Sequence, residues 1–214
     1  MDILNEISTF LQQGRTPKVK ELVAAAIEEG VEPQKILEDG LLAGMSIIGE
    51  KFKNNEVFVP EVLIAARAMN AGVEILKPQL VAAGVKSKGT AVLGTVKGDL
   101  HDIGKNIVKM MLEGKGLAVI DLGVDVAPEN FVAQAQEHHA DIICCSALLT
   151  TTMNEMKHVV EQAESAGIRD NVKIMIGGAP VTQSFCDSIG ADYYTSDAAR
   201  CADIALQICQ GEIG

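Results

Sequence analysis

A carboxylate, a histidine and a glycine lie close together in residues 94–106, which read Gly-Thr-Val-Lys-Gly-Asp-Leu-His-Asp-Ile-Gly-Lys-Asn. Asp99, His101 and Gly104 form the pattern D-x-H-x-x-G. A carboxylate two residues before a histidine can accept one ring N–H and leave the other ring nitrogen free to bind a metal. Gly104 lacks a Cβ, so the backbone there can come close to whatever the histidine holds.

This pattern by itself leaves several interpretations open. A hydrogen-bonded structural turn is the commonest fate of an isolated Asp/His pair. A simple divalent-metal site would need three or four protein ligands, and the other histidines (His138, His139 and His158) fall in or at the ends of expected helices. A cofactor whose metal is already coordinated by a macrocycle would need only one axial ligand, and a single histidine would then suffice.

The elements that must position this histidine alternate between strand and helix from residue 89 onward. Five strands separated by helices predict a parallel sheet covered on both faces. We expect a flavodoxin-like (Rossmann-like) α/β domain over 89–214, with strand order 2-1-3-4-5. The expected strands are 90–96, 117–122, 141–146, 172–177 and 192–195. The expected helices lie near 103–115, 128–138, 152–166, 181–189 and 198–210.

Two further loops at the carboxyl ends of expected strands carry unusual chemistry. Residues 146–153 read Ser-Ala-Leu-Leu-Thr-Thr-Thr-Met, and residues 177–180 read Gly-Gly-Ala-Pro. Thr151 or Thr152 is expected to cap the helix that follows, which leaves the other hydroxyls unexplained. The two glycines suit either a tight turn or a slot. Since strands 1, 3 and 4 are neighbours in the expected order, the three loops should converge. Neither a G-x-G-x-x-G nucleotide fingerprint nor a Walker lysine pattern follows the first strand.

The first 84 residues read as four helices joined by short connections, which predicts a bundle of antiparallel neighbours. Gly14 ends the first helix, and Thr16 is expected to cap the second. The third helix begins near Pro33, and the fourth begins at Pro60 and ends near residue 81. We take 1–84 as one domain and the polar, glycine-bounded stretch that follows as a linker.

Composition narrows the classes of protein that remain. The chain has 214 residues, is 48% hydrophobic and carries a net charge of −11 without a basic run, so nucleic acid is not expected as a partner. The five cysteines show no C-x-x-C spacing, which suits a reducing cytoplasm. No signal peptide or membrane-spanning stretch is evident, and we expect a cytoplasmic protein without a membrane partner.

Together the three loops resemble the cobalamin-binding module. The pattern D-x-H-x-x-G is followed at fitting distances by S-x-L (Ser146 and Leu148) and by G-G (Gly177 and Gly178). Residues 49–52 and 56–61 resemble the helical cap of cobalamin-dependent methionine synthase. The whole chain is similar to stand-alone corrinoid proteins of methyltransferase systems, which serve methylamines, methanol, betaines or methoxylated aromatics.

The resemblance implies that cobalamin binds base-off, with its nucleotide tail in a deep slot and His101 as the lower axial ligand of cobalt. Asp99 would orient the imidazole, and Thr152 matches a serine that completes a proton relay in methionine synthase. The remaining residues that the resemblance assigns to the cofactor are Asp102 and Gly104 below the corrin; Ser146 and Thr150, which would bond the tail; Gly177, Gly178 and Ala179 at its slot; Leu148 of the S-x-L motif; and Phe52 and Val59, which would cover the upper face.

The implied function is a methyl carrier that is not catalytic alone. It would use methylcobalamin, cob(I)alamin or a related corrinoid, and would pass methyl between a substrate-specific methyltransferase and an acceptor methyltransferase that uses folate or a thiol. A reductive activation protein is the third implied partner. One alternative is the cobalamin-binding subunit of a mutase, which would not need the Phe52 and Val59 cap. The other is a cobalamin-sensing regulator, which would need a DNA-binding domain that this acidic chain does not show.

Overall fold

The computed structural model describes residues 2–213 and divides into two compact units. Unit 1 runs to Ser87 and includes Gly114–Gly116, and unit 2 comprises Lys88–Glu113 together with the chain from Leu117 onward. Within residues 2–213, no helix combines the length and the apolar character that a membrane crossing requires.

Unit 1 is a helical bundle, as the sequence predicts. Three of its helical segments follow one another without a break over 33–53, so they form the expected third helix with a π-helical stretch at its centre. Thr16 is the first residue of the second helix rather than its cap, because Arg15 occupies the capping position. The elements are α1 (Ile3–Gln12), α2 (Thr16–Glu28), α3 (Pro33–Lys35), η1 (Ile36–Leu42), α4 (Ala43–Lys53) and α5 (Val59–Ala82).

The apolar positions that repeat with helical spacing face inward in unit 1. Ile7 and Leu11 of α1 are fully buried, as are Ile36 and Leu41 of η1. Two glycines bring α1 close to the third helix. A Cβ at Gly40 would lie 3.2 Å from a methyl group of Ile7, and one at Gly44 would lie 3.1 Å from the backbone of Ser8. Small residues thus set the spacing of these helices.

Unit 2 contains a five-stranded, all-parallel sheet in the order β2-β1-β3-β4-β5, which confirms the flavodoxin-like prediction. Across the three central strands, Thr95 at the end of β1 lies opposite Ser146 at the end of β3, and Ser146 lies opposite Gly177 at the end of β4. The strands are β1 (Thr90–Thr95), β2 (Ala118–Asp121), β3 (Ile142–Ser146), β4 (Lys173–Gly177) and β5 (Tyr193–Tyr194).

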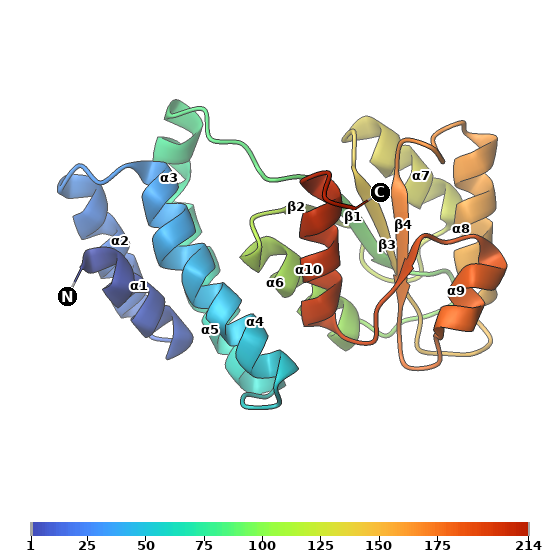
Figure 1. Ribbon diagram of the computed structural model, residues 1–214, viewed down its shortest axis with the longest axis horizontal. Coiled ribbons are helices and arrows are strands. Elements are labelled where there is room, and N and C mark those ends of the chain that lie inside the picture. The colour runs from blue at the N-terminus through green and yellow to red at the C-terminus, as the bar shows by residue number, and fades with distance from the viewer. Residues whose placement is uncertain (1, 214) are drawn as a thin grey trace. The chain divides into compact units, whose positions relative to one another are not determined.

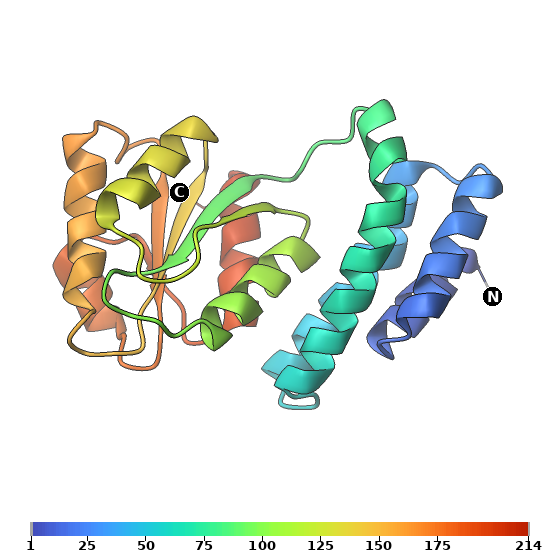
Figure 2. The same cartoon turned by 180° about the vertical axis from the view of Figure 1, so that it is seen from behind.

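Helices cover both faces of this sheet. α6 and α10 lie on one face, and α7, α8 and α9 lie on the other (Figures 1 and 2). Fully buried residues such as Val92, Ile143 and Phe131 form a continuous core between the strands and α7–α9. The helices are α6 (Ile103–Gly114), α7 (Pro128–Glu137), α8 (Asn154–Ser165), α9 (Gln183–Ile189) and α10 (Ala198–Cys209).

Candidate functional site

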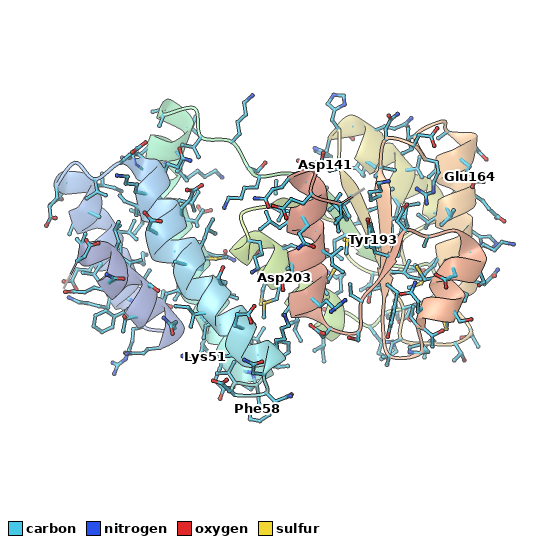
Figure 3. All side chains as sticks on the ribbon, in the orientation of Figure 1. Lys51, Phe58, Asp141, Glu164, Tyr193 and Asp203 are labelled. Carbon is cyan, nitrogen blue, oxygen red and sulfur yellow. The ribbon has the colours of Figure 1, made fainter. Side chains whose placement is uncertain are left out.

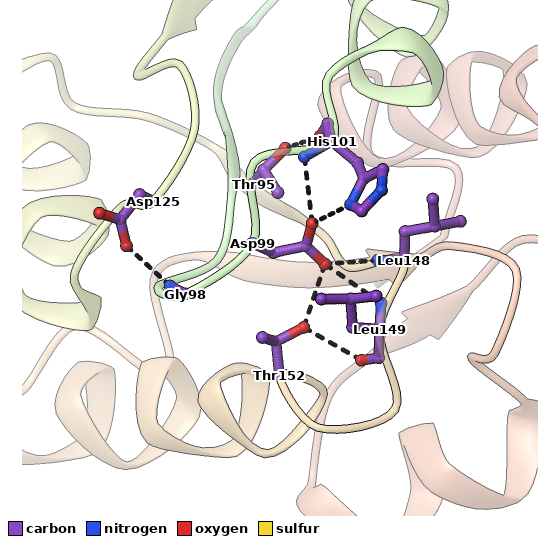
Figure 4. Close-up of polar contacts among 8 residues, drawn as sticks. All are labelled: Thr95, Gly98, Asp99, His101, Asp125, Leu148, Leu149 and Thr152. Carbon is purple, nitrogen blue, oxygen red and sulfur yellow. Dashed lines mark hydrogen bonds and ion pairs between the residues drawn. The ribbon is translucent and has the colours of Figure 1, made fainter.

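The carboxyl ends of β1 and β3 meet at the buried side chain of Asp99, which is 0% exposed (Figure 4). Its Oδ2 atom accepts hydrogen bonds from the backbone N–H groups of Leu148 (2.8 Å) and Leu149 (3.2 Å). Oδ2 also lies 3.0 Å from the hydroxyl of Thr152. Oδ1 accepts the backbone N–H of His101 (3.1 Å) and lies 2.6 Å from the Nδ1 atom of that ring. The two predicted loops therefore converge on one carboxylate.

These contacts keep Asp99 ionised in spite of its burial. Removal from water would by itself raise the pKa of this carboxyl. The hydrogen bonds from Leu148, from the ring and backbone of His101, and from Leu149 act in the opposite direction and hold the pKa well below its usual range. A buried carboxylate that is anionic and accepts on both oxygens is a fixed negative anchor for the imidazole.

The pairing with Asp99 sets both the tautomer and the orientation of His101. An ionised carboxylate can only accept a hydrogen bond, so Nδ1 must be protonated and its N–H donates a hydrogen bond to Oδ1. In the neutral ring, Nε2 then keeps a free lone pair. The hydroxyl of Thr95, which is fully buried, donates to the carbonyl oxygen of His101 at 2.8 Å. The side chain of His101 remains 51% exposed. The arrangement leaves Nε2 as the candidate ligand atom.

Thr152 does not cap a helix, which is the role that local reasoning from the sequence predicts. We expected Thr151 or Thr152 to cap the next helix, but α8 has Met153 at its N-cap position and no side-chain cap. The Thr152 hydroxyl instead lies 3.0 Å from Asp99 Oδ2 and 3.0 Å from the carbonyl oxygen of Leu149, so its one proton is shared between two acceptors. Thr152 thus belongs to the Asp99 network rather than to the helix.

The two glycines after β4 differ in what surrounds them. Gly178 has φ +136°, and a Cβ there would overlap the carbonyl oxygen of Ala147. A Cβ at Gly177 would meet only the carbonyl oxygen of Thr195, at an ordinary 3.5 Å. Glycine at 178 is therefore required by the fold, whereas a methyl group at 177 would be tolerated. Ser146 is half-buried beside Gly177, whereas Thr150 and Ala179 are exposed.

Large apolar side chains in the segments next to His101 and after β3 are exposed. Four leucine and isoleucine residues of these segments, which we call the apolar rim, are between 39% and 71% exposed. Asp102 in the His101 loop and Gly104 at the start of α6 are also exposed, and a Cβ at Gly104 would meet no atom within 4 Å. Apart from Leu148, the sequence analysis did not identify the rim, although leucine and isoleucine in solvent-facing loops are a usable signal. The apolar rim consists of Leu100, Ile103, Leu148 and Leu149.

The remaining predicted site residues, Phe52 and Val59, lie in unit 1. Phe52 is near the end of α4 and Val59 is the first residue of α5, and both side chains are half-buried. Between them, Phe58 projects into solvent with 64% of its surface exposed (Figure 3). The backbone N–H of Phe58 donates to the carboxylate of Glu61 (3.1 Å), which fixes the start of α5.

Comparison with known proteins identifies the family. A model described as a B12 binding domain matches residues 89–202, and a second model with the same description matches residues 3–77. The chain belongs to the B12-binding family of corrinoid proteins. The cofactor and the fold inferred from the sequence are thereby confirmed.

The relatives of this corrinoid protein include members of methylamine and methanol systems. It is 49% identical to trimethylamine corrinoid protein 1 of Methanosarcina mazei, over 83% of each chain. It is 41% identical to a corrinoid protein of Desulfitobacterium hafniense, over 97% of this chain and 98% of the relative. Among solved structures, it is 34% identical, with a TM-score of 0.89, to a chain of the methanol:cobalamin methyltransferase complex MtaBC from Methanosarcina barkeri, covering 98% of this chain and 80% of that one.

The residues around His101 fit a corrinoid better than a bare metal ion. Within residues 2–213, no group of three or more histidine, cysteine or acidic side chains could hold a metal ion. One ring nitrogen free of Asp99, on a half-exposed side chain close to the exposed apolar rim, suits a metal that arrives in a large, flat macrocycle. The open space at Gly104 also leaves room for a bulky group close to the backbone.

The network around Asp99 leads to a prediction about stability. We expect Asp99→Asn to lower the free energy of unfolding of the cofactor-free protein by roughly 2–4 kcal/mol at neutral pH, because an amide cannot accept on both sides. Since the folded-state pKa of Asp99 is lowered, its stabilising contribution is complete above the ordinary pKa of about 3.9 and decreases as the pH falls below it. Urea unfolding of both proteins at about pH 7 and about pH 3 measures this. A difference that stays constant over this range would contradict it.

Proposed function

We propose that this protein is a methyl carrier that binds a corrinoid base-off, with His101 as the lower axial ligand. The observation that carries the proposal is the 2.6 Å contact between Asp99 Oδ1 and His101 Nδ1, which leaves Nε2 directed outward as the free ligand atom. The cobalt of the bound corrinoid supplies the chemistry, by accepting the methyl group and releasing it again. The protein supplies ligation, shielding and a docking surface.

Several residues of unit 2 are proposed to hold the rest of the cofactor. Asp102, Gly104 and the apolar rim would lie against the lower face of the corrin, because these groups are exposed around His101. The nucleotide tail would enter beside the paired ends of β3 and β4, where Gly177 carries no side chain. The proposed tail-binding residues are Ser146, Thr150, Gly177, Gly178 and Ala179, and Leu148 would contact the cofactor as part of the apolar rim.

Asp99 and Thr152 are proposed to form a proton relay behind His101. With Nε2 on a metal, the anionic Asp99 would hold the ring in one orientation by accepting the Nδ1–H. With Nε2 off the metal, the ring could take up a proton, and Asp99 would then stabilise its positive charge. The Thr152 hydroxyl, which lies at equal distances from Asp99 and the Leu149 carbonyl, can adjust its donation between these states.

Phe52 and Val59 are proposed to shield the methyl group on the upper face. Both are apolar and only half-buried within unit 1, so part of each side chain remains available for a contact outside the bundle core. Shielding of this kind keeps water and oxidants away, and the shielding residues must move when a partner enzyme needs access.

The proposed partners are a substrate-specific methyltransferase, an acceptor methyltransferase that uses folate or a thiol, and a reductive activation protein. The solved MtaBC structure is of a methyltransferase complex, and other relatives are named for trimethylamine and dimethylamine, which supports a methylated amine or alcohol as the donor class. These relatives favour the carrier over a mutase subunit or a cobalamin-sensing regulator.

The proposal is tested by reconstituting the protein with methylcobalamin and removing free cofactor by desalting. We expect the corrinoid to stay bound and to lose its methyl group only when an acceptor methyltransferase and its thiol or folate are added, as followed by absorption spectroscopy. The Phe52→Ala protein is the matched comparison, because it should hold the corrinoid but exchange methyl less selectively. A protein that retains no corrinoid, or retains it without exchanging methyl with any methyltransferase, would refute the carrier proposal.

A further inference from the structure

The loop after β2, residues 121–126, contacts the loop that carries His101 from the side opposite β3. None of its residues was singled out from the sequence, and none contributes to the Asp99 carboxylate network. It is nevertheless joined by four hydrogen bonds to Thr95, at the end of β1, and to the loop that follows. Thr95 N–H donates to the Gly123 carbonyl oxygen (2.9 Å), Val126 N–H donates to the Thr95 carbonyl oxygen (3.0 Å), and the other two bonds join Asp125 to Gly98 and Asp99.

Asp125 makes a pair of contacts with the loop that carries His101. Its Oδ1 atom accepts the backbone N–H of Gly98 at 2.7 Å (Figure 4), and its own backbone N–H donates to the carbonyl oxygen of Asp99 at 3.0 Å. The two contacts thus hold the peptide unit before Gly98 and the peptide unit after Asp99. Gly98 has φ +80°, so the chain reverses sharply just before Asp99 and needs an external partner to fix it.

The backbone of Asp125 is itself strained by this arrangement. Its φ of +53° is one of three positive values among the non-glycine residues described, the others being at Asn55 and His139. The left-handed region costs an ordinary side chain free energy, and it persists where surrounding contacts determine it. A strained backbone beside a candidate ligand site is the usual setting of a residue that fixes geometry for function.

A second attachment joins the same loop to the start of α6. Lys105, which is 2% exposed, donates to Asp121 Oδ1 at 2.6 Å and to Asn106 Oδ1 at 2.9 Å. Asn106 in turn donates to Asp102 Oδ2 at 3.1 Å. Partial burial of Asp121 would raise its pKa, but the hydrogen bond and charge of Lys105 hold the pKa below its usual value. This ion pair gives the β2–α7 loop an attachment that does not involve Asp125.

We propose that Asp125 is a positioning residue that fixes the backbone of Asp99, and through Asp99 the direction of His101 Nε2. The proposal deepens the proposed function and rests on it for the role of His101 in ligation. The physical reason is that Asp99 can orient the imidazole only if its own main chain is held. Apart from those of His101, the contacts to the Asp99 carboxylate come from residues after β3. The contact to the Asp99 carbonyl oxygen comes from Asp125.

Two substitutions separate the hydrogen bond from the backbone conformation. Asp125→Gly removes the side-chain acceptor and relieves the positive φ, so it should not unfold the protein. Asp125→Asn keeps an acceptor oxygen and tolerates the same φ, so it should behave like the original protein. His139→Gly is the matched control, because His139 also has a positive φ (+48°) and lies shortly before β3, at the end of the strands opposite the loop that carries His101.

The first measurement uses the cofactor-free protein. In nuclear magnetic resonance spectra, the Nδ1 proton of His101 should exchange slowly in the original protein and in Asp125→Asn, because it is held by Asp99. In Asp125→Gly we expect exchange of this proton and of the Gly98 amide to be roughly tenfold faster, the effect of losing about one hydrogen bond. Unchanged exchange in Asp125→Gly would overturn the proposal without reference to cobalamin.

The second measurement uses protein loaded with methylcobalamin. The ratio of histidine-ligated to unligated cofactor, read from the absorption spectrum, should fall roughly tenfold in Asp125→Gly, as expected for loss of a partner behind a metal ligand. It should stay unchanged in Asp125→Asn and His139→Gly. An equal fall in His139→Gly would show a general loss of stability and overturn the proposal. If His101→Ala leaves the original spectrum intact, the proposed function fails, while the exchange measurement still decides the role of Asp125.

Discussion

Replacing His101 with alanine should convert the methylcobalamin complex from a histidine-ligated to an unligated base-off spectrum. The reason is that His101 presents a single outward nitrogen, fixed by Asp99 at 2.6 Å. Loss of a residue behind a metal ligand typically costs about 10–100-fold in affinity, so loss of the ligand should cost roughly the same or more. Absorption spectroscopy after desalting, together with a cobalamin titration, measures both effects.

A matched histidine is available as the control. His158 is exposed to a similar degree and lies 3.4 Å from Glu155, so it is also a surface histidine beside a carboxylate. His158→Ala should retain the ligated spectrum. A His101→Gly protein adds a test of mechanism, because added imidazole should enter the gap and restore ligation. If His101→Ala keeps the ligated spectrum, axial ligation by His101 is refuted.

Gly178→Ala is expected to be the most destabilising single methyl addition in unit 2. Its backbone, at φ +136°, lies outside the conformations that alanine prefers, and the added methyl would overlap the Ala147 carbonyl oxygen. Strain and overpacking together should lower the free energy of unfolding by about 3 kcal/mol or more. Because domains are stable by only about 5–15 kcal/mol, the variant should unfold at much lower urea concentration or fail to accumulate.

Gly177→Ala, one residue earlier, separates folding from binding. The added methyl would meet only the Thr195 carbonyl oxygen at 3.5 Å, so the free energy of unfolding should change by less than about 1 kcal/mol. If the nucleotide tail lies against residue 177, the variant should bind cobalamin more weakly than the original protein does. It should bind cobinamide, which lacks the tail, with unchanged affinity. Equal weakening for both ligands would place the tail elsewhere, and equal stability of the two glycine variants would contradict the steric argument.

Much of the fold follows from patterns that act locally in the sequence. Continuous apolar runs such as Ile142–Cys145 can be buried only in a sheet covered on both faces, and their alternation with helices determines a parallel arrangement. Helical spacing in the first 84 residues likewise predicts the bundle. The π-helical stretch Ile36–Leu42 was not predictable, because its periodicity differs little from that of an α-helix over seven residues.

The candidate site divides in the same way. Asp99 and His101 can be recognised as a pair from the sequence because they are two residues apart, which is close enough for their side chains to make contact. The role of Thr152 was predicted only by resemblance, and local reasoning assigned it to a helix cap that it does not form. Asp125 gave no signal at all, because its partner Gly98 lies 27 residues away.

The sequence by itself determined the order of strands and helices, the ligand histidine candidate with its carboxylate, and the family to which the chain belongs. Only the tertiary structure decided which distant groups contact the Asp99 carboxylate and which of two adjacent glycines the fold requires. It also decided which loop contacts the loop that carries His101. The physical reason is distance along the chain. Hydrogen bonds between neighbours can be inferred from spacing, whereas contacts such as Asp99 to Leu148 depend on strand register, which is set by packing of the whole sheet.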